Sequence, residues 1–218
     1  MSASKKNRFL QKSPHVVGTI PSPEALAVAL KMKPGAVDFF ELRIDHFADD
    51  PAPLLRAAPR LKAPLIITVR HPAEGGHGAL PLARRRELYA QFLPHAALLD
   101  LELRSLPALA GTVAEAQASG VAVIGSAHFF KTTPKFEKLD ALYLRARAAG
   151  LDAFKIATLT RTPDDVHTLF RLLLRHPRTP ISAMGMGPCG KLSRLLLAHA
   201  GSVLNLSLIH ISEPTRPY

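Results

Sequence analysis

The chain has 218 residues, 47% hydrophobic and 21% charged, which is the composition of a soluble globular protein of one or two domains. Its net charge of +11 arises from scattered basic residues without zinc-finger spacing or aromatic interleaving, which argues against a nucleic-acid-binding protein. No apolar run is long enough for a membrane span or a secretory signal, and a lone cysteine, Cys189, fits a reducing compartment. We therefore expect a cytoplasmic protein.

Eight short apolar runs alternate with longer amphipathic stretches. The runs cover 15–20, 37–44, 64–70, 97–103, 121–126, 152–157, 179–184 and 202–208, and the helix-like stretches cover 24–32, 83–93, 106–120, 138–150, 163–176 and 190–201. Three of the stretches end in a glycine that leads directly into the next run, as a helix feeding a strand does. This alternation predicts parallel βαβ units, in either a closed barrel or an open doubly wound sheet. The count of eight and the lack of a G-x-G-x-x-G after the first run favour a (β/α)₈ TIM barrel of the α/β class.

Charged side chains occupy one face of the second run. Glu41 and Arg43 alternate with the apolar residues Phe40, Leu42 and Ile44. Since strand side chains alternate in direction, the apolar set must face the helices, and Glu41 and Arg43 must then face the barrel lumen. A purely structural alternative is that these two charges only pair with each other.

Further polar side chains lie at or after the carboxyl ends of other runs, where barrel enzymes place their chemistry. Arg70 ends the third run, Glu74 lies in the following glycine-rich turn, His128 follows the fifth run, Lys155 lies within the sixth, and Arg194 follows the seventh. Their recurrence on five strands favours a catalytic site over a set of unrelated surface residues.

Lys155 is flanked by Phe154 and Ile156, so we expect its amine to be desolvated. Burial and nearby arginines (Arg43, Arg70 and Arg194) favour the neutral amine, which is the form that attacks a ketone to give an imine. A histidine can then remove the acidified neighbouring proton, an acidic residue such as Glu74 can orient that histidine, and arginines can hold a carboxylate. The pattern predicts proton abstraction next to a carbonyl on a small anionic substrate.

Two other readings of the residues are weaker. The stretch GMGPCGKL at 185–192 nearly matches a phosphate-binding loop, but Leu192 stands where a metal-binding hydroxyl belongs. Ten histidines are present, yet no H-E-x-x-H or comparable metal-binding cluster appears. Nucleotide hydrolysis and metal catalysis are therefore not expected.

The motifs of the chain resemble the type I 3-dehydroquinate dehydratases, the Schiff-base lyases of the shikimate pathway in aromatic amino acid biosynthesis. The matching segments are ELRID (41–45), TVRHPAEGG (68–76), SAHFFKTTP (126–134), FKIAT (154–158) with PDDV (163–166), and ISAMGMGPCGKLSR (181–194), in family order. The resemblance covers roughly residues 15–206 and implies a TIM barrel that commonly forms a homodimer. It implies no metal and no organic cofactor.

The resemblance also implies a role for each candidate residue. Lys155 would form the imine with the C3 ketone of 3-dehydroquinate, His128 would act as general acid and base, and Glu74 would pair with His128. Ring hydroxyls would be held by Glu41, Arg43 and Arg70, the substrate carboxylate by Arg194, and a further contact would come from Thr19. Phe129 departs from the family, which usually has an acidic residue after the histidine.

The end of the chain departs further from the family pattern. After SVLN the family continues into a loop and a final helix, whereas this chain reads LSLIHISEPTRPY. We interpret residues 1–14 as a flexible basic tail, 15–206 as the catalytic barrel with a truncated last unit, and 207–218 as a non-native tail. The alternatives are another Schiff-base barrel, such as an aldolase or transaldolase, and an inactive remnant.

Overall fold

The computed structural model of the chain describes residue 10 and residues 14–208. The eight strands are β1 (His15–Ile20), β2 (Phe39–Arg43), β3 (Leu65–Thr68), β4 (Ala96–Glu102), β5 (Ala122–Phe129), β6 (Ala153–Leu159), β7 (Ile181–Met186) and β8 (Leu204–Leu208). They form one parallel sheet in the order β7-β6-β5-β4-β3-β2-β1-β8. Every strand therefore lies beside its neighbour in the sequence, as the strands of a barrel do.

The two end strands of this sheet, β7 and β8, approach each other at their amino ends. The Val203 amide donates to the Ile181 carbonyl at 2.9 Å, and the Ser182 hydroxyl donates to the Leu204 carbonyl at 2.8 Å. The eight strands thus make a nearly closed barrel, which confirms the predicted fold class. The open doubly wound sheet is wrong, because its strand order would reverse near the middle of the sheet.

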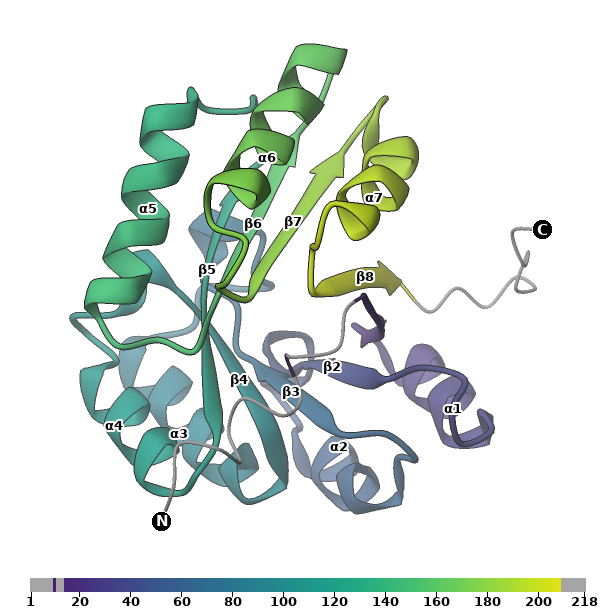
Figure 1. Ribbon diagram of the computed structural model, residues 1–218. Coiled ribbons are helices and arrows are strands. Elements are labelled where there is room, and N and C mark those ends of the chain that lie inside the picture. Colours follow the sequence, from purple (N-terminus) through teal and green to yellow (C-terminus); the bar gives the residue numbers. More distant parts are fainter. Residues whose placement is uncertain (1–9, 11–13, 209–218) are drawn as a thin grey trace.

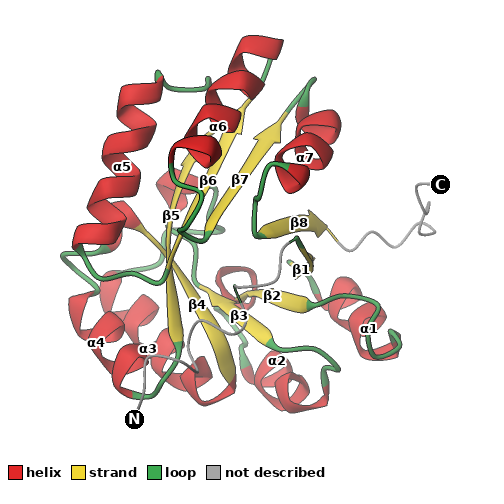
Figure 2. Cartoon of the chain, in the orientation of Figure 1, coloured by secondary structure: helices red, strands yellow, loops and turns green. Residues whose placement is uncertain are grey.

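The helices lie outside the strands (Figures 1 and 2). They are α1 (Pro23–Lys31), α2 (Ala52–Ala57), α3 (Leu82–Phe92), α4 (Ala110–Ala118), α5 (Phe136–Ala148), α6 (Pro163–Arg175) and α7 (Gly190–His199). The sequence patterns predicted all of these except α2, a helix of 6 residues in a proline-rich stretch where no helical periodicity develops.

Local signals set the helix ends. At the start of α6, Thr162 and Asp165 form a capping box, with Pro163 at the first helical position. After α4 and α5, Gly120 and Gly150 adopt φ values of 78° and 69°, which glycine reaches without strain. These turns feed β5 and β6, so they fix where His128 and Lys155 enter the barrel.

Side-chain alternation divides the apolar core in two. Leu42, Ile67 and Ile156 point outward into the larger cluster between strands and helices, as the sequence predicted for the second run. Phe39, Ile66 and the other members of a smaller cluster point inward and fill much of the lumen. At the carboxyl end of the lumen, polar residues lie beside a few apolar ones such as Met184 and Leu206.

The two predicted tails lie largely outside the described residues. Leu10 is buried against the lumen cluster, whereas residues 1–9 and 11–13 fall outside the description. Strand β8 extends to Leu208, and residues 209–218, with the predicted truncation of the last unit, also fall outside it. Among the described helices, none has both the length and the apolar character needed to cross a membrane.

Candidate active site

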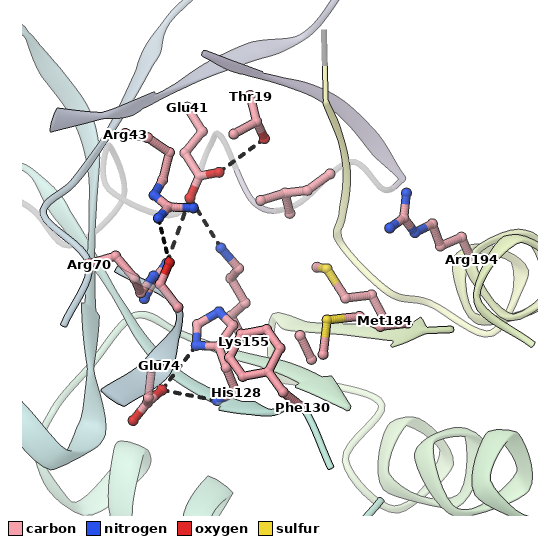
Figure 3. Close-up of a pocket in the computed structure, with 14 residues that line it drawn as sticks. Thr19, Glu41, Arg43, Arg70, Glu74, His128, Phe130, Lys155, Met184 and Arg194 are labelled. Carbon is pink, nitrogen blue, oxygen red and sulfur yellow. Dashed lines mark hydrogen bonds and ion pairs between the residues drawn. The ribbon is translucent and has the colours of Figure 1, made fainter. Parts of the chain in front are cut away.

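A cavity of about 240 Å³ opens at the carboxyl ends of the strands (Figure 3). All eight residues singled out from the sequence line it: Thr19, Glu41, Arg43, Arg70, Glu74, His128, Lys155 and Arg194. They come from β1, β2, β5 and β6 and from the segments after β3 and β7. The barrel therefore brings together side chains that lie up to 175 positions apart in the chain, from Thr19 to Arg194.

Lys155 lies in the lumen with 3% of its surface exposed. Its Nζ donates to Oδ2 of Asp100 at 2.7 Å and to Oε1 of Glu41 at 3.3 Å. Arg43, Arg70 and Arg194 line the same cavity, as the sequence interpretation expected, but the direct partners of the amine are two carboxylates. A buried amine between carboxylates is held firmly in place, with its nitrogen at the floor of the cavity.

Asp100 is the residue that the sequence interpretation missed most clearly. It is fully buried, and its two carboxylate oxygens accept from Nη1 and Nη2 of Arg70 at 3.0 Å each. Burial acts to raise the pKa of Asp100, but Arg70 and Lys155 lower it by more, so the carboxylate stays ionised. Its signal in the sequence was the acidic pair in ALLDLEL, whose alternation places both acids in the lumen.

Arg70 is 2% exposed and has further buried partners. Its Nη1 also donates to Oε1 of Glu102 at 3.1 Å and to the Ser126 hydroxyl at 2.7 Å. Glu102 in turn accepts from Nη2 of Arg85 at 2.7 Å. Most of the guanidinium of Arg70 is thus hydrogen-bonded within the protein. This arginine therefore holds the buried carboxylates of Asp100 and Glu102 in place, as well as lining the cavity.

His128 lies in β5, near its carboxyl end, rather than just past the strand. Its Nδ1 and its backbone nitrogen each lie 3.0 Å from Oε2 of Glu74. Burial, followed by the charges of Arg70 and Lys155, holds the pKa of His128 well below 6.5. Burial also raises the pKa of Glu74 to about 7. A neutral imidazole oriented by a carboxylate is suited to accept a proton.

Glu41 and Arg43 do not form the isolated pair that the structural alternative required. Glu41 accepts from the hydroxyls of Thr19 and Thr68 at 3.0 Å each, in addition to Lys155. Arg43 instead binds Asp45, with Nε and Nη2 at 3.0 and 2.8 Å from its two oxygens.

Arg194 differs from the other arginines of the cavity. It lies in α7, and Figure 3 shows it apart from the cluster around Lys155. Its Nε is buried and has no hydrogen-bond partner within residues 14–208. Burial lowers the pKa of Arg194 below its usual range, and no neighbouring charge within the described residues offsets this effect. An anion that enters the cavity would supply the missing partner.

Phe130 is a further lining residue that the sequence interpretation did not single out. It is 50% exposed, and its ring lies nearly parallel to that of His128, with centroids 6.3 Å apart. Within the described part of the chain, no group of three or more His, Cys, Asp or Glu side chains is arranged to hold a metal ion.

A nearly closed (β/α)₈ barrel with a buried lysine and a carboxylate-oriented histidine at the carboxyl ends of its strands is the architecture of a barrel enzyme. The sequence model of the type I 3-dehydroquinase family matches residues 17–215. The chain therefore belongs to the type I 3-dehydroquinase family.

Individual relatives agree with this membership. The 3-dehydroquinate dehydratase of Thermodesulfovibrio yellowstonii is 32% identical over 212 residues, covering 94% of this chain and 91% of the relative. The crystal structure of the Enterococcus faecalis 3-dehydroquinate dehydratase has a TM-score of 0.82 at 30% identity, covering 93% of this chain and 92% of that one. The type I enzyme of Clostridium difficile, with covalently modified comenic acid, has a TM-score of 0.84 at 25% identity, covering 95% and 89%.

Proposed function

We propose that this enzyme dehydrates 3-dehydroquinate to 3-dehydroshikimate through an imine on Lys155. The observation that carries the proposal is the arrangement of three side chains around one cavity: a buried lysine, a neutral histidine, and an arginine whose buried Nε has no partner among the described residues. The substrate has a ketone for the lysine, an acidic proton next to that ketone for the histidine, and a carboxylate for the arginine. Family membership supports the same reaction.

Substrate binding would depend first on the attraction between the substrate carboxylate and an arginine. The carboxylate on C1 of the substrate would bind Arg194, whose buried Nε has no partner within residues 14–208. The ring hydroxyls would lie against Glu41, Arg43 and Arg70, with Thr19 fixing the Glu41 carboxylate from the other side. These contacts would orient the C3 ketone toward Nζ of Lys155.

Imine formation needs the neutral amine. In our proposal the Lys155 ammonium gives one proton to the neutral imidazole of His128, and the amine then adds to C3. His128 returns that proton to the oxygen of the carbinolamine and then carries a second proton from the carbinolamine nitrogen to the same oxygen, so that water leaves and a C=N⁺ bond forms. The positive charge on nitrogen is unchanged, so Asp100 remains its counterion, at 2.7 Å from Nζ.

Elimination follows from the charged imine, which acidifies the C2 proton. His128 removes this proton to give an enamine, and then returns it to the C1 hydroxyl as the C–O bond breaks. One water leaves, and the C1=C2 double bond is formed. Glu74 would orient the imidazole through Nδ1 and stabilise its transient positive charge. Hydrolysis of the imine then frees the product and regenerates Lys155.

A turnover assay tests the reaction. The product is a conjugated enone, which absorbs in the ultraviolet where the saturated substrate ketone does not. We expect the wild-type chain to generate this absorbance and Lys155→Met to lose it while still folding, as its circular dichroism spectrum would show. A Lys155→Met variant that retains wild-type turnover would exclude an imine at this position.

We also propose that the enzyme is a cytoplasmic homodimer. One support is the exposure of Leu192, Leu195 and Leu196 on α7, an apolar surface suited to a second copy. Another is Cys189, a single free thiol of the kind found in reducing compartments. Light scattering at two protein concentrations would give the mass, and a monomer at both would refute the dimer.

A further inference from the structure

Asp45 is a buried carboxylate that the proposed reaction does not use. It follows β2 in the 3-10 turn η1 (Ile44–Phe47) and is 1% exposed. Burial acts to raise its pKa, but the hydrogen bond and charge of Arg43 lower it by more, so the group is ionised. An ionised carboxylate at this depth must be compensated by several donors.

Its donors come from two separate parts of the site. Nε and Nη2 of Arg43 approach the carboxylate at 3.0 and 2.8 Å. The backbone amides of Arg70 and His77 approach it at 3.2 and 2.9 Å. One carboxylate therefore binds a guanidinium of the substrate cavity and both ends of the segment 70–77.

The segment 70–77 is the turn that carries Glu74. Its centre is the 3-10 helix η3 (Pro72–Glu74), followed by Gly75 with φ 82°. The Gly75 carbonyl accepts from Nη2 of Arg43 at 2.8 Å, so the turn and the arginine are also joined directly. Fixing the two ends and the middle of a short turn leaves Glu74 little freedom to move.

We infer that Asp45 is a positioning residue. It fixes the Arg43 guanidinium relative to the turn that carries Glu74, and through Glu74 it fixes the imidazole of His128. The inference rests on the proposed function, because it assigns Asp45 an effect on the substrate contact of Arg43 and on proton transfer by His128. Asp45 touches none of the reacting atoms. Its influence passes through Glu74, whose Oε2 lies 3.0 Å from both nitrogens of His128 that it contacts.

The test compares two aspartates with similar hydrogen bonding. Asp165 accepts from the amides of Arg161 and Thr162 at 2.8 and 3.0 Å and from the Thr162 hydroxyl at 3.2 Å, yet it does not line the cavity. Asp45→Asn should lower kcat about 10-fold and raise KM about 10-fold, the scale of a misplacement near 1 Å. Asp165→Asn should leave both constants within about 2-fold of wild type, whatever it does to the unfolding temperature.

Two further measurements separate positioning from general destabilisation. In a Glu74→Gln background, Asp45→Asn should reduce kcat less than about 3-fold, because the group through which it acts has already been altered. Asp45→Glu keeps the negative charge beside Arg43 but moves it by one methylene. It should fold and still lose about 5-fold or more in kcat, which keeps the test decisive if Asp45→Asn does not fold.

The inference would be overturned if Asp45→Asn or Asp45→Glu folded and kept wild-type kcat and KM. It would also be overturned if the effects of Asp45→Asn and Glu74→Gln on kcat were fully additive. Borohydride trapping of substrate on the wild-type chain distinguishes these outcomes from a failure of the proposed function. An adduct on Lys155 with normal kinetics in the Asp45 variants would refute the positioning role alone.

Discussion

One oxygen of Glu74, Oε2, lies 3.0 Å from the backbone nitrogen of His128 and 3.0 Å from its ring Nδ1. The carboxylate therefore fixes both the backbone and the imidazole ring of His128. When Glu74 is ionised it accepts a hydrogen bond from the protonated Nδ1, which leaves Nε2 unprotonated and able to act as a base. When Glu74 is protonated it favours the opposite tautomer, with the proton on Nε2.

The first prediction concerns the pH dependence of catalysis. Because burial raises the pKa of Glu74 to about 7, kcat/KM of the wild type should rise with pH through a midpoint near that value. Glu74→Gln removes this titration and the compensating charge. We expect its pH profile to lose that midpoint and kcat at pH 8 to fall about 10-fold. An unchanged midpoint in the variant would show that another group controls it.

The second prediction concerns stability and uses the same variant. The folded chain binds the Glu74 proton more tightly than the unfolded chain, since the pKa rises from 4.5 to about 7 on folding. The stabilisation is present below pH 4.5 and is lost as pH rises toward 7. Urea unfolding should therefore show Glu74→Gln gaining stability relative to wild type between pH 5 and pH 8, by on the order of 2 kcal/mol. A pH-independent difference would contradict the raised pKa.

The third prediction concerns Arg194. Arg194→Met should raise KM about 100-fold, because a charge-assisted hydrogen bond to the substrate carboxylate is lost. The variant should not lose stability, since the buried Nε has no partner to forfeit within residues 14–208. Arg56 on α2 is exposed, and Arg56→Met is the matched control with an expected KM close to wild type. A normal KM in Arg194→Met would place the carboxylate elsewhere.

The fourth prediction concerns the buried charges below the cavity. Asp100→Asn removes the carboxylate that Arg70 and Lys155 share, leaving their charges undercompensated. We expect a loss of about 3–5 kcal/mol in the free energy of unfolding, measured with urea. The control is Asp140→Asn, which breaks a more exposed pair with His176 and should cost less than about 1 kcal/mol. Equal losses of unfolding free energy in both variants would contradict the claim that the buried network contributes more to stability than a more exposed pair.

Much of the site could be predicted from strand alternation. The apolar neighbours of Glu41 and Lys155 fill the shell between strands and helices, so the charged residues had to face the lumen. The same rule applied to ALLDLEL would have found Asp100 and Glu102. They were overlooked because a strand that ends with alternating acids also looks like an ordinary surface strand.

The partners of the charged residues could not be predicted in the same way. Arg70 contacts Asp100, Glu102 and Ser126, which lie 30, 32 and 56 positions away, and only the register of β3, β4 and β5 brings them together. The alternation rule gives the face of a side chain but not its neighbours on adjacent strands. For this reason the sequence interpretation expected arginines near Lys155 but did not predict that two carboxylates would be the hydrogen-bond partners of its amine.

The central claim is that Lys155 forms a covalent imine with the substrate ketone. Incubating the wild-type chain with 3-dehydroquinate and borohydride would reduce the imine to a stable secondary amine, and peptide mass spectrometry would locate it. The proposal predicts a single adduct on the peptide that contains Lys155, and no adduct in Lys155→Met. An adduct on another lysine, or full turnover without any adduct, would contradict it.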